Sequence, residues 1–234
     1  LPKGLGAAYL GPAPDGGESE KAIRFVRFAP DGGVLSDEVI DPDVCTCCQT
    51  STALTENGPI VAYRDHESGE IRDISVVMLK DGRWSRPRPV HRDGWRINAC
   101  PVNGPALAAS ANRVAVAWYS GADEKPRVFV AFSGDAGVSF TKPAVLDSGT
   151  PLGRVGLVLL ADGGAVVSWI TKTSAGVGDL MIRRVSADGR LGATHRVSAV
   201  DTARRTGFPK MVLYDRRLIL AWTADRVRTV QVPV

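Results

Sequence analysis

The chain has 234 residues, of which 44% are hydrophobic, and a formal net charge of +4. That length is enough to bury a large core in one domain. Lysines and arginines come singly or in pairs beside Asp or Pro, which is the pattern of a solvated surface and excludes a nucleic-acid partner. No apolar run reaches the length of a membrane span.

A repeat of about fifty residues runs along the whole chain. Each of five apolar segments ends in an aromatic residue: Gly6–Tyr9, Ile60–Tyr63, Val114–Trp118, Ala165–Trp169 and Leu218–Trp222. The closing aromatics are 54, 55, 51 and 53 residues apart (9 to 63, 63 to 118, 118 to 169 and 169 to 222). A period of that size with several short strands predicts an all-β fold, a β-propeller of four-stranded antiparallel blades. One blade cannot bury both of its faces, so the blades must stack around an axis.

The third repeat shows the predicted strands most clearly. Its inner strand is expected at 105–109, the second at 113–119, the third at 127–132 and the outer fourth at 140–147. Each run is short, rich in β-branched or aromatic residues, and bounded by Gly, Pro, Asn or Asp. The second strand is nearly all apolar, as expected for a strand packed on both faces.

A turn motif separates the third and fourth predicted strands. It contains Ser133, Asp135, Gly137 and Phe140, and worn versions surround Asp31, Asp81 and Asp188. The motif resembles the Asp-box of sialidases and related propellers, the BNR superfamily. Asp135 can accept backbone N–H groups, Gly137 can take a positive φ, and Phe140 can fill the gap between sheets. These are folding roles, so a structural function of Asp135 is favoured over a catalytic one.

The two ends of the chain fall inside repeats. The chain opens in what reads as a second strand (4–10) and closes after a third (227–234), so five units are visible. The resemblance to sialidases implies six blades. We therefore expect residues 1–234 to form a single propeller domain that lacks N-terminal strands or a blade, because an open propeller would expose two sheet edges. A missing N-terminal segment or a partner chain would complete it; the alternative is a five-unit ring closed in an unusual way.

Four cysteines form the least ordinary feature. Cys45, Cys47 and Cys48 precede one predicted inner strand and Cys100 precedes the next, with Cys47 and Cys100 at equivalent positions. The segments are expected to converge at the mouth of the central channel. Three interpretations stay open. They are disulfides in a secreted or periplasmic protein, such as Cys47–Cys100 with Cys45–Cys48; a copper or zinc site; and a reactive thiol. His66, His91 and His195 are scattered and are interpreted as surface residues rather than ligands.

Loops that enter inner strands and loops that join second to third strands share one face of a propeller, and binding residues concentrate on such loops. The candidate ligand-binding residues on that face are Arg64, Asp65, Arg72, Asp73, Trp95, Arg96, Asn103, Arg154 and Arg205. Several arginines at one mouth would form a site for a carbohydrate or another small anionic ligand. Taken singly, each of these residues has a structural interpretation, because Arg and Asp pairs also staple loops.

The resemblance to sialidases implies three arginines that clamp a sugar carboxylate, a Tyr nucleophile paired with a Glu, and an Asp acid/base. Arg72, Arg154 and Arg205 are candidates for the clamp by position, but no Tyr or Glu matches, since Tyr63 and Tyr119 end strands where a plug is expected. We therefore predict a secreted or periplasmic sialidase-like propeller that binds a glycan or anionic ligand and is not a competent sialidase. The alternatives are an exo-sialidase or other glycoside hydrolase with part of its site on missing N-terminal blades, and metal binding through the cysteines.

Overall fold

The computed structural model describes residues 4–15, 17 and 20–233. Its strands form five sheets that follow one another along the chain, and every strand pair in them is antiparallel. The predicted all-β fold is confirmed, and the third and fourth sheets have the predicted four antiparallel strands. Within the described residues, no helix has the length and apolar character that a bilayer span requires.

The first sheet contains β1 (Leu5–Pro12), β2 (Lys21–Phe28) and β3 (Val34–Asp41). The second contains β4 (Ser51–Thr55), β5 (Gly58–Arg64), β6 (Ile74–Lys80), β7 (Arg83–Trp84) and β8 (Arg88–Pro89). The third contains β9 (Ala106–Ser110), β10 (Arg113–Ser120), β11 (Arg127–Ser133) and β12 (Ala144–Asp147). The fourth contains β13 (Pro151–Leu159), β14 (Ala165–Ser174), β15 (Val177–Val185) and β16 (Leu191–Asp201). The fifth contains β17 (Lys210–Tyr214), β18 (Arg217–Thr223) and β19 (Val227–Pro233). Two short 3-10 helices are η1 (Ala122–Glu124) and η2 (Arg204–Thr206).

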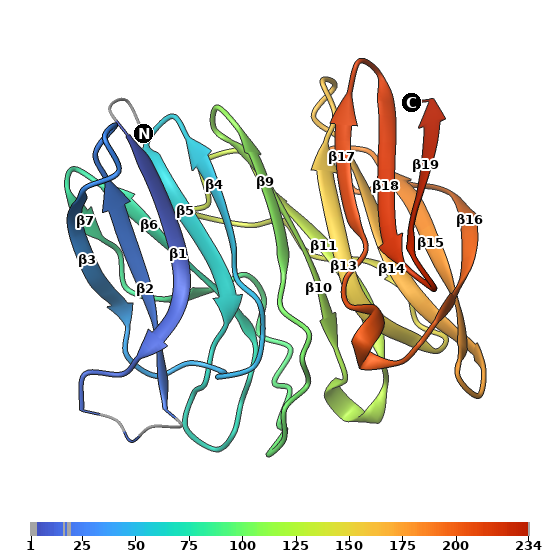
Figure 1. Ribbon diagram of the computed structural model, residues 1–234, viewed down its shortest axis with the longest axis horizontal. Helices are drawn as coiled ribbons and strands as arrows, with labels where there is room; N and C mark the ends of the chain where they lie inside the picture. The colour runs from blue at the N-terminus through green and yellow to red at the C-terminus, as the bar shows by residue number, and fades with distance from the viewer. Residues whose placement is uncertain (1–3, 16, 18–19, 234) are drawn as a thin grey trace.

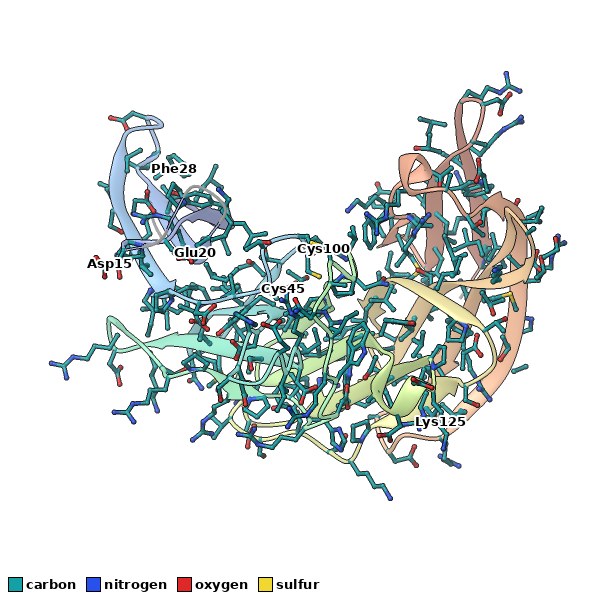
Figure 2. All side chains as sticks on the ribbon, turned by 90° about the horizontal axis from the view of Figure 1, so that it is seen from below. Asp15, Glu20, Phe28, Cys45, Cys100 and Lys125 are labelled. Carbon is teal, nitrogen blue, oxygen red and sulfur yellow. The ribbon has the colours of Figure 1, made fainter. Side chains whose placement is uncertain are left out.

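The sheets are arranged in an arc, as blades of a propeller are. The first strands of successive sheets (β1, β4, β9, β13 and β17) are neighbours along its inner side (Figure 1). Figure 2 shows the first and fifth sheets at the two ends of the arc, with the other three sheets between them. The number of blades in a complete ring stays a prediction.

The third sheet follows the predicted strands except at its outer edge. The fourth strand, β12, begins at Ala144 rather than at residue 140. Phe140 does not pair in the sheet; it packs against the core cluster between the second and third sheets. The chain therefore needs a few more residues of loop before it can rejoin the sheet.

The turn before β12 is held by side chains. Asp135 accepts hydrogen bonds from the backbone N–H of Ser139 (2.9 Å) and from the hydroxyls of Ser139 (2.6 Å) and Ser133 (2.7 Å). These bonds, with that from the Ser139 hydroxyl foremost, lower the pKa of Asp135 to about 2. Gly137 has a φ of +92°, and a Cβ there would lie 2.4 Å from the Cδ1 of Ile60, so this position requires glycine.

The closing aromatics of the second, third and fourth sheets each fasten their sheet to the preceding one. Each donates a hydrogen bond to an aspartate at or just beyond the outer strand of that preceding sheet: Tyr63 to Asp41 (2.5 Å), Trp118 to Asp93 (2.7 Å) and Trp169 to Asp147 (2.7 Å). The same side chains are at most 1% exposed. A buried indole or phenol normally needs a polar partner, so the repeated aspartate allows a large ring to be buried at this point of each repeat.

Candidate functional site

A pocket of about 350 Å³ lies on the inner side of the arc; we call it the mouth pocket. Its lining comes from the loops before β9 and β17, the end of β10 and the start of β13: Trp95, Ile97, Pro101, Val102, Asn103, Tyr119, Leu152, Arg154, Thr202, Arg204 and Phe208. These loops enter inner strands or follow a second strand. The lining therefore joins segments more than a hundred residues apart in sequence.

One side of the mouth pocket is aromatic. The rings of Trp95 and Tyr119 meet edge to face, with centroids 5.5 Å apart. Asp73 fixes the loop that carries Trp95, because it accepts the N–H groups of Gly94 (2.9 Å) and Trp95 (3.0 Å). Burial raises the pKa of Asp73. The tryptophan is thus held in place before any ligand arrives.

The other side of the mouth pocket is cationic. Arg154 donates from Nη1 to the hydroxyl of Thr206 (3.0 Å) and from Nη2 to the carbonyl of Thr202 (2.8 Å). Burial lowers the pKa of Arg154. These hydrogen-bond acceptors are neutral oxygens, and the carboxylate of Asp201 attracts the guanidinium as well. Arg204 is exposed on the same lining.

The backbone at Arg154 is in the left-handed region, with a φ of 54°. The preceding Gly153 has a φ of +78°, and a Cβ on it would lie 2.4 Å from the Oδ1 of Asn103. That oxygen accepts the N–H of Arg154 at 2.8 Å. The close approach of Asn103 to this turn sets the position of the arginine.

Arg64 and Asp73 lie beneath the mouth pocket rather than on its lining. Asp65, which accepts the N–H of His66 at 2.8 Å, is not part of the lining either. Arg64 is 1% exposed and donates to the carbonyl of Asn103 from Nε (2.9 Å) and Nη2 (2.7 Å). It also donates to the carbonyls of Arg72 and Tyr119, and its guanidinium lies 4.7 Å from the centre of the Trp95 ring. Burial lowers the pKa of Arg64 and raises that of Asp65 to about 6. Arg64 and Asp73 therefore support the pocket from inside.

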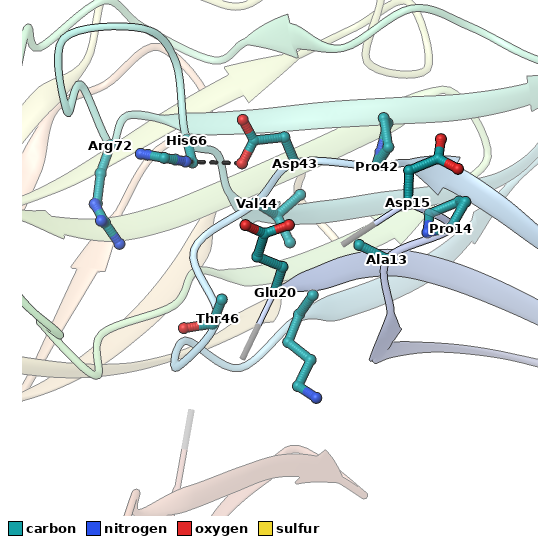
Figure 3. A pocket seen from close by; sticks show the side chains of 11 residues that line it. Ala13, Pro14, Asp15, Glu20, Pro42, Asp43, Val44, Thr46, His66 and Arg72 are labelled. Atoms are coloured by element: carbon teal, nitrogen blue, oxygen red, sulfur yellow. Dashed lines mark hydrogen bonds and ion pairs between the residues drawn. The ribbon is translucent and has the colours of Figure 1, made fainter. Parts of the chain in front are cut away.

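Arg72 lies at a different cavity, which has a volume of about 540 Å³ and reaches the first sheet (Figure 3). There it pairs with Glu70 at 2.8 Å, while His66 and Asp43 form a second pair at 2.7 Å on the same lining. Among the described side chains, Arg72 and Arg154 therefore line separate cavities, so they do not form a clamp of three arginines with a third.

Arg96 is exposed and donates to the carbonyl of Gly69 (3.2 Å), away from the mouth pocket. The side chain of Arg205 lies outside what the structure describes. Of the nine predicted ligand residues, the mouth pocket brings together Trp95, Asn103 and Arg154. The lining also contains Tyr119, Arg204 and Phe208, which are not among those nine residues. Tyr119 had a signal, since it directly follows the closing aromatic of its strand, where the chain turns onto the shared face.

The cysteine cluster, Cys45, Cys47, Cys48 and Cys100, adjoins the mouth pocket. The Sγ atom of Cys45 lies 3.7 Å from that of Cys47 and 3.4 Å from that of Cys48. Cys100 is exposed and interacts with the Cys47 thiol, so the two cysteine segments converge. Figure 2 shows Cys45 and Cys100 on the concave side of the arc. All four thiols are free in the structure, and the disulfide interpretation stays a prediction.

The thiols of this cluster differ in their surroundings. The hydrogen bond from Cys48, together with the N–H of Cys47 and the guanidinium of Arg72, lowers the pKa of Cys45 to about 5. Burial raises the pKa of Cys47 to about 12. The bond to Cys45 and burial both raise the pKa of Cys48. Negative charge is therefore concentrated on Cys45, on the side that faces Arg72.

No family model matches the chain, and no curated protein matches it. The chain is similar in fold to a Hadza microbial sialidase, with a TM-score of 0.53 and 16% identity over 92% of this chain and 53% of that one. It is also similar to a protein of unknown function from Dyadobacter fermentans (TM-score 0.58, 13% identity, 92% and 69% covered). A third similar structure is the Aleuria aurantia lectin in complex with alpha-methyl-L-fucoside (0.50, 9%, 100% and 80%). The chain spans about half the length of the sialidase, and identities this low show the fold alone.

Proposed function

We propose that the chain is a divergent sialidase-like propeller of the BNR/Asp-box type, and that its mouth pocket binds a carbohydrate or another small anionic ligand. The observation that carries the proposal is the pairing of fixed aromatic rings with two arginines across one cavity of about 350 Å³. That volume lies in the range of small-molecule sites. A secreted or periplasmic location belongs to the same proposal and is checked by cell fractionation.

The chemistry of the lining supports an anionic sugar. The apolar face of a sugar ring can lie against Tyr119 or Phe208, with the buried Trp95 packed against Tyr119, while a carboxylate is matched by a guanidinium. Arg204 is the exposed cation and needs no rearrangement to reach a ligand, whereas Arg154 is held by its loop partners. The sialidase and the lectin among the structures of similar fold are consistent with a carbohydrate ligand, but they do not identify which sugar binds.

Binding is favoured over hydrolysis by the residues that line the mouth pocket. Glycosidases use a carboxylate pair or, in sialidases, a tyrosine with acidic partners. No Asp or Glu is among the described residues of this lining. Glycoside hydrolysis is the competing function. It predicts that the protein cleaves a fluorogenic sialoside.

A glycan array that carries sialylated, uronic-acid and neutral sugars tests the proposal, followed by calorimetric titration of the sugars that bind. We expect binding of acidic sugars and a loss of about tenfold or more in affinity for Arg204→Ala, because a charge-assisted hydrogen bond is removed. Phe208→Ala should also weaken binding. The matched control is Arg86→Ala, which removes an equally exposed arginine in the loop between β7 and β8.

Absence of binding to every sugar at millimolar concentration would overturn the proposal. Equal affinities for Arg204→Ala, Phe208→Ala and the control would place binding elsewhere on the chain. Release of fluorophore from the sialoside would replace binding by hydrolysis as the function.

A further inference from the structure

The cysteine cluster has the geometry of a metal site. The Sγ atoms of Cys45, Cys47 and Cys48 all lie within 4.8 Å of one another, and two of the distances are 3.4 and 3.7 Å. Thiolates bound about 2.3 Å from one ion in trigonal or tetrahedral geometry lie roughly 3.8–4.0 Å apart. Adjustments of at most about 1 Å in the Sγ–Sγ distances would give all three sulfurs a common ion.

The segments that carry these thiols are held by hydrogen bonds to the backbone that do not involve the sulfur atoms. Gln49 and Gly104 clamp the two segments together through a reciprocal pair of hydrogen bonds, at 2.9 and 3.2 Å. The N–H of Cys45 donates to the carbonyl of Arg64 at 3.1 Å. The ligand atoms are therefore held close together by contacts that involve none of the sulfurs, which is the preorganisation that a metal site requires.

The charged groups around the cysteine cluster favour a negative charge on its sulfur atoms. Arg64 is 1% exposed beside Cys45 and Cys48; it donates to backbone carbonyl oxygens and also interacts with the Cys48 thiol. Among the described carboxylates, Asp73 and Asp93 attract it without forming a direct ion pair. A guanidinium stays charged inside a protein, and a buried charge without a directly paired counter-charge is costly. Disulfides would leave Arg64 beside neutral sulfur, whereas thiolates on a metal ion retain a net negative charge.

N–H groups also point at the sulfurs, as partners of metal-bound thiolates do. Asn103 donates its backbone N–H to the Sγ of Cys48 at 3.3 Å, and Arg72 donates Nη1 to the Sγ of Cys45 at 3.5 Å. Such donors stabilise and orient ligating atoms. They also connect the cluster to the mouth pocket, because Asn103 belongs to both.

We propose that Cys45, Cys47 and Cys48 bind one copper(I) ion, with Cys100 as an exchangeable fourth thiol at the solvent side. The ligand group contains sulfur alone, without imidazole or carboxylate, which selects a soft ion. Structural zinc sites close with four ligands, whereas three thiols converge here and the fourth is exposed. A monovalent ion also leaves more negative charge on the cluster, opposite Arg64 and Arg72.

The test uses the full chain, purified under argon with a phosphine reductant, and titrates it with copper(I) against a chromogenic copper(I) chelator. We expect one equivalent of copper, a matching mass increase in native mass spectrometry, and three cysteines that resist alkylation until the protein is unfolded. Cys47→Ser, at a half-buried position, should weaken copper binding by more than about 100-fold, since losing a ligand costs more than losing an outer partner. Cys100→Ser should weaken it by less than about tenfold.

The control is Thr46→Ser, an exposed position between two ligands, which should bind copper as the unaltered chain does. Thermal unfolding of every variant separates loss of ligand from loss of fold. No copper uptake by folded protein with four free thiols would overturn the proposal. So would disulfides in protein purified without added oxidant. Uptake of zinc but not copper(I) in the same competition would overturn the choice of ion. Glycan binding is measured separately, so either proposal can fail without the other.

Discussion

The three middle sheets and the two end sheets share one sequence repeat but differ in how much of it they bury. In β10 of the third sheet, five consecutive residues from Val114 to Trp118 are buried. In β18 of the fifth sheet the corresponding strand alternates, and its closing Trp222 is half-buried. Exposed apolar side chains gather on the end sheets, with Tyr214 72%, Val227 69% and Val34 64% exposed.

This difference shows that the repeat specifies a strand that can be buried on both faces, while the neighbours decide whether it is. Stability in a stacked array is roughly a sum of the stability of each sheet and of the interfaces between sheets. Among the described residues, each middle sheet has another sheet on both of its sides, whereas each end sheet has one on a single side. Equivalent substitutions should therefore cost more in the middle of the arc than at its ends.

The largest expected effect comes from the closing tryptophans. Trp118→Ala should lower the free energy of unfolding by about 3–5 kcal/mol, because a fully buried ring and its hydrogen bond to Asp93 are lost. Trp222→Ala should cost about 1–2 kcal/mol, since that ring is half-buried. Urea unfolding followed by circular dichroism measures both, and Asp93→Ala tests the hydrogen bond because it removes the acceptor and keeps the ring. Equal losses for Trp118→Ala and Trp222→Ala would contradict the difference between middle and end sheets.

The next effect concerns two carboxylates with opposite pKa shifts. Burial raises the pKa of Asp65 in the second sheet to about 6, whereas Tyr9 and Arg24 lower that of the exposed Asp37 in the first. Folding therefore disfavours ionisation of Asp65, and this contribution to stability falls as pH rises from about 4 to about 6, by at most about 3 kcal/mol. Asp37 contributes in the opposite sense, with stability lost as pH falls below about 4.

Asp65→Asn should match the unaltered chain in stability at pH 4 and exceed it at pH 7, because the amide mimics the protonated acid. Urea midpoints across pH 4–7 measure this. Asp37→Asn serves as the control; relative to the unaltered chain, its stability should not increase as the pH rises from 4 to 7. A parallel pH dependence for Asp65→Asn and the unaltered chain would mean that Asp65 is ionised at little cost.

The smallest effect compares turns before outer strands. Asp135→Ala should cost about 1–2 kcal/mol, because three hydrogen bonds from Ser133 and Ser139 lose their acceptor. Asp31→Ala in the first sheet should cost less than about 0.5 kcal/mol, since Asp31 accepts the N–H of Gly33 on an exposed turn. Thermal unfolding of the two variants decides between them, and a larger loss for Asp31→Ala would reverse the expected order.

The fold was predictable because apolar strands and closing aromatics are local signals repeated along the chain. The boundary at residue 140 was not, since it depends on Phe140 turning into a neighbouring sheet. The aspartate partners of the aromatics also escaped sequence reasoning. Asp93 and Trp118 are far apart in sequence, and only the stacking of sheets brings them together.

The candidate site was predictable only to the level of the face on which it lies. Trp95, Asn103 and Arg154 meet there, because equivalent loops of neighbouring repeats must converge. The same argument placed Arg64 on that face, but its side chain turns inward to reach carbonyl groups of two other segments. Periodicity fixes where a backbone goes; the direction of a long side chain depends on which buried acceptors lie within its reach.

Asn103 leaves almost no room for substitution. Its N–H, its carbonyl, and both ends of its side-chain amide are engaged, with Cys48, Arg64, Arg154 and Leu152. Aspartate has no amide to donate, serine is too short, and glutamine would push the turn at Gly153 outward. Asparagine at position 103 is therefore required for the second, third and fourth sheets to meet at one junction. In a mutational scan of the chain, this polar position should be as intolerant as the buried tryptophans.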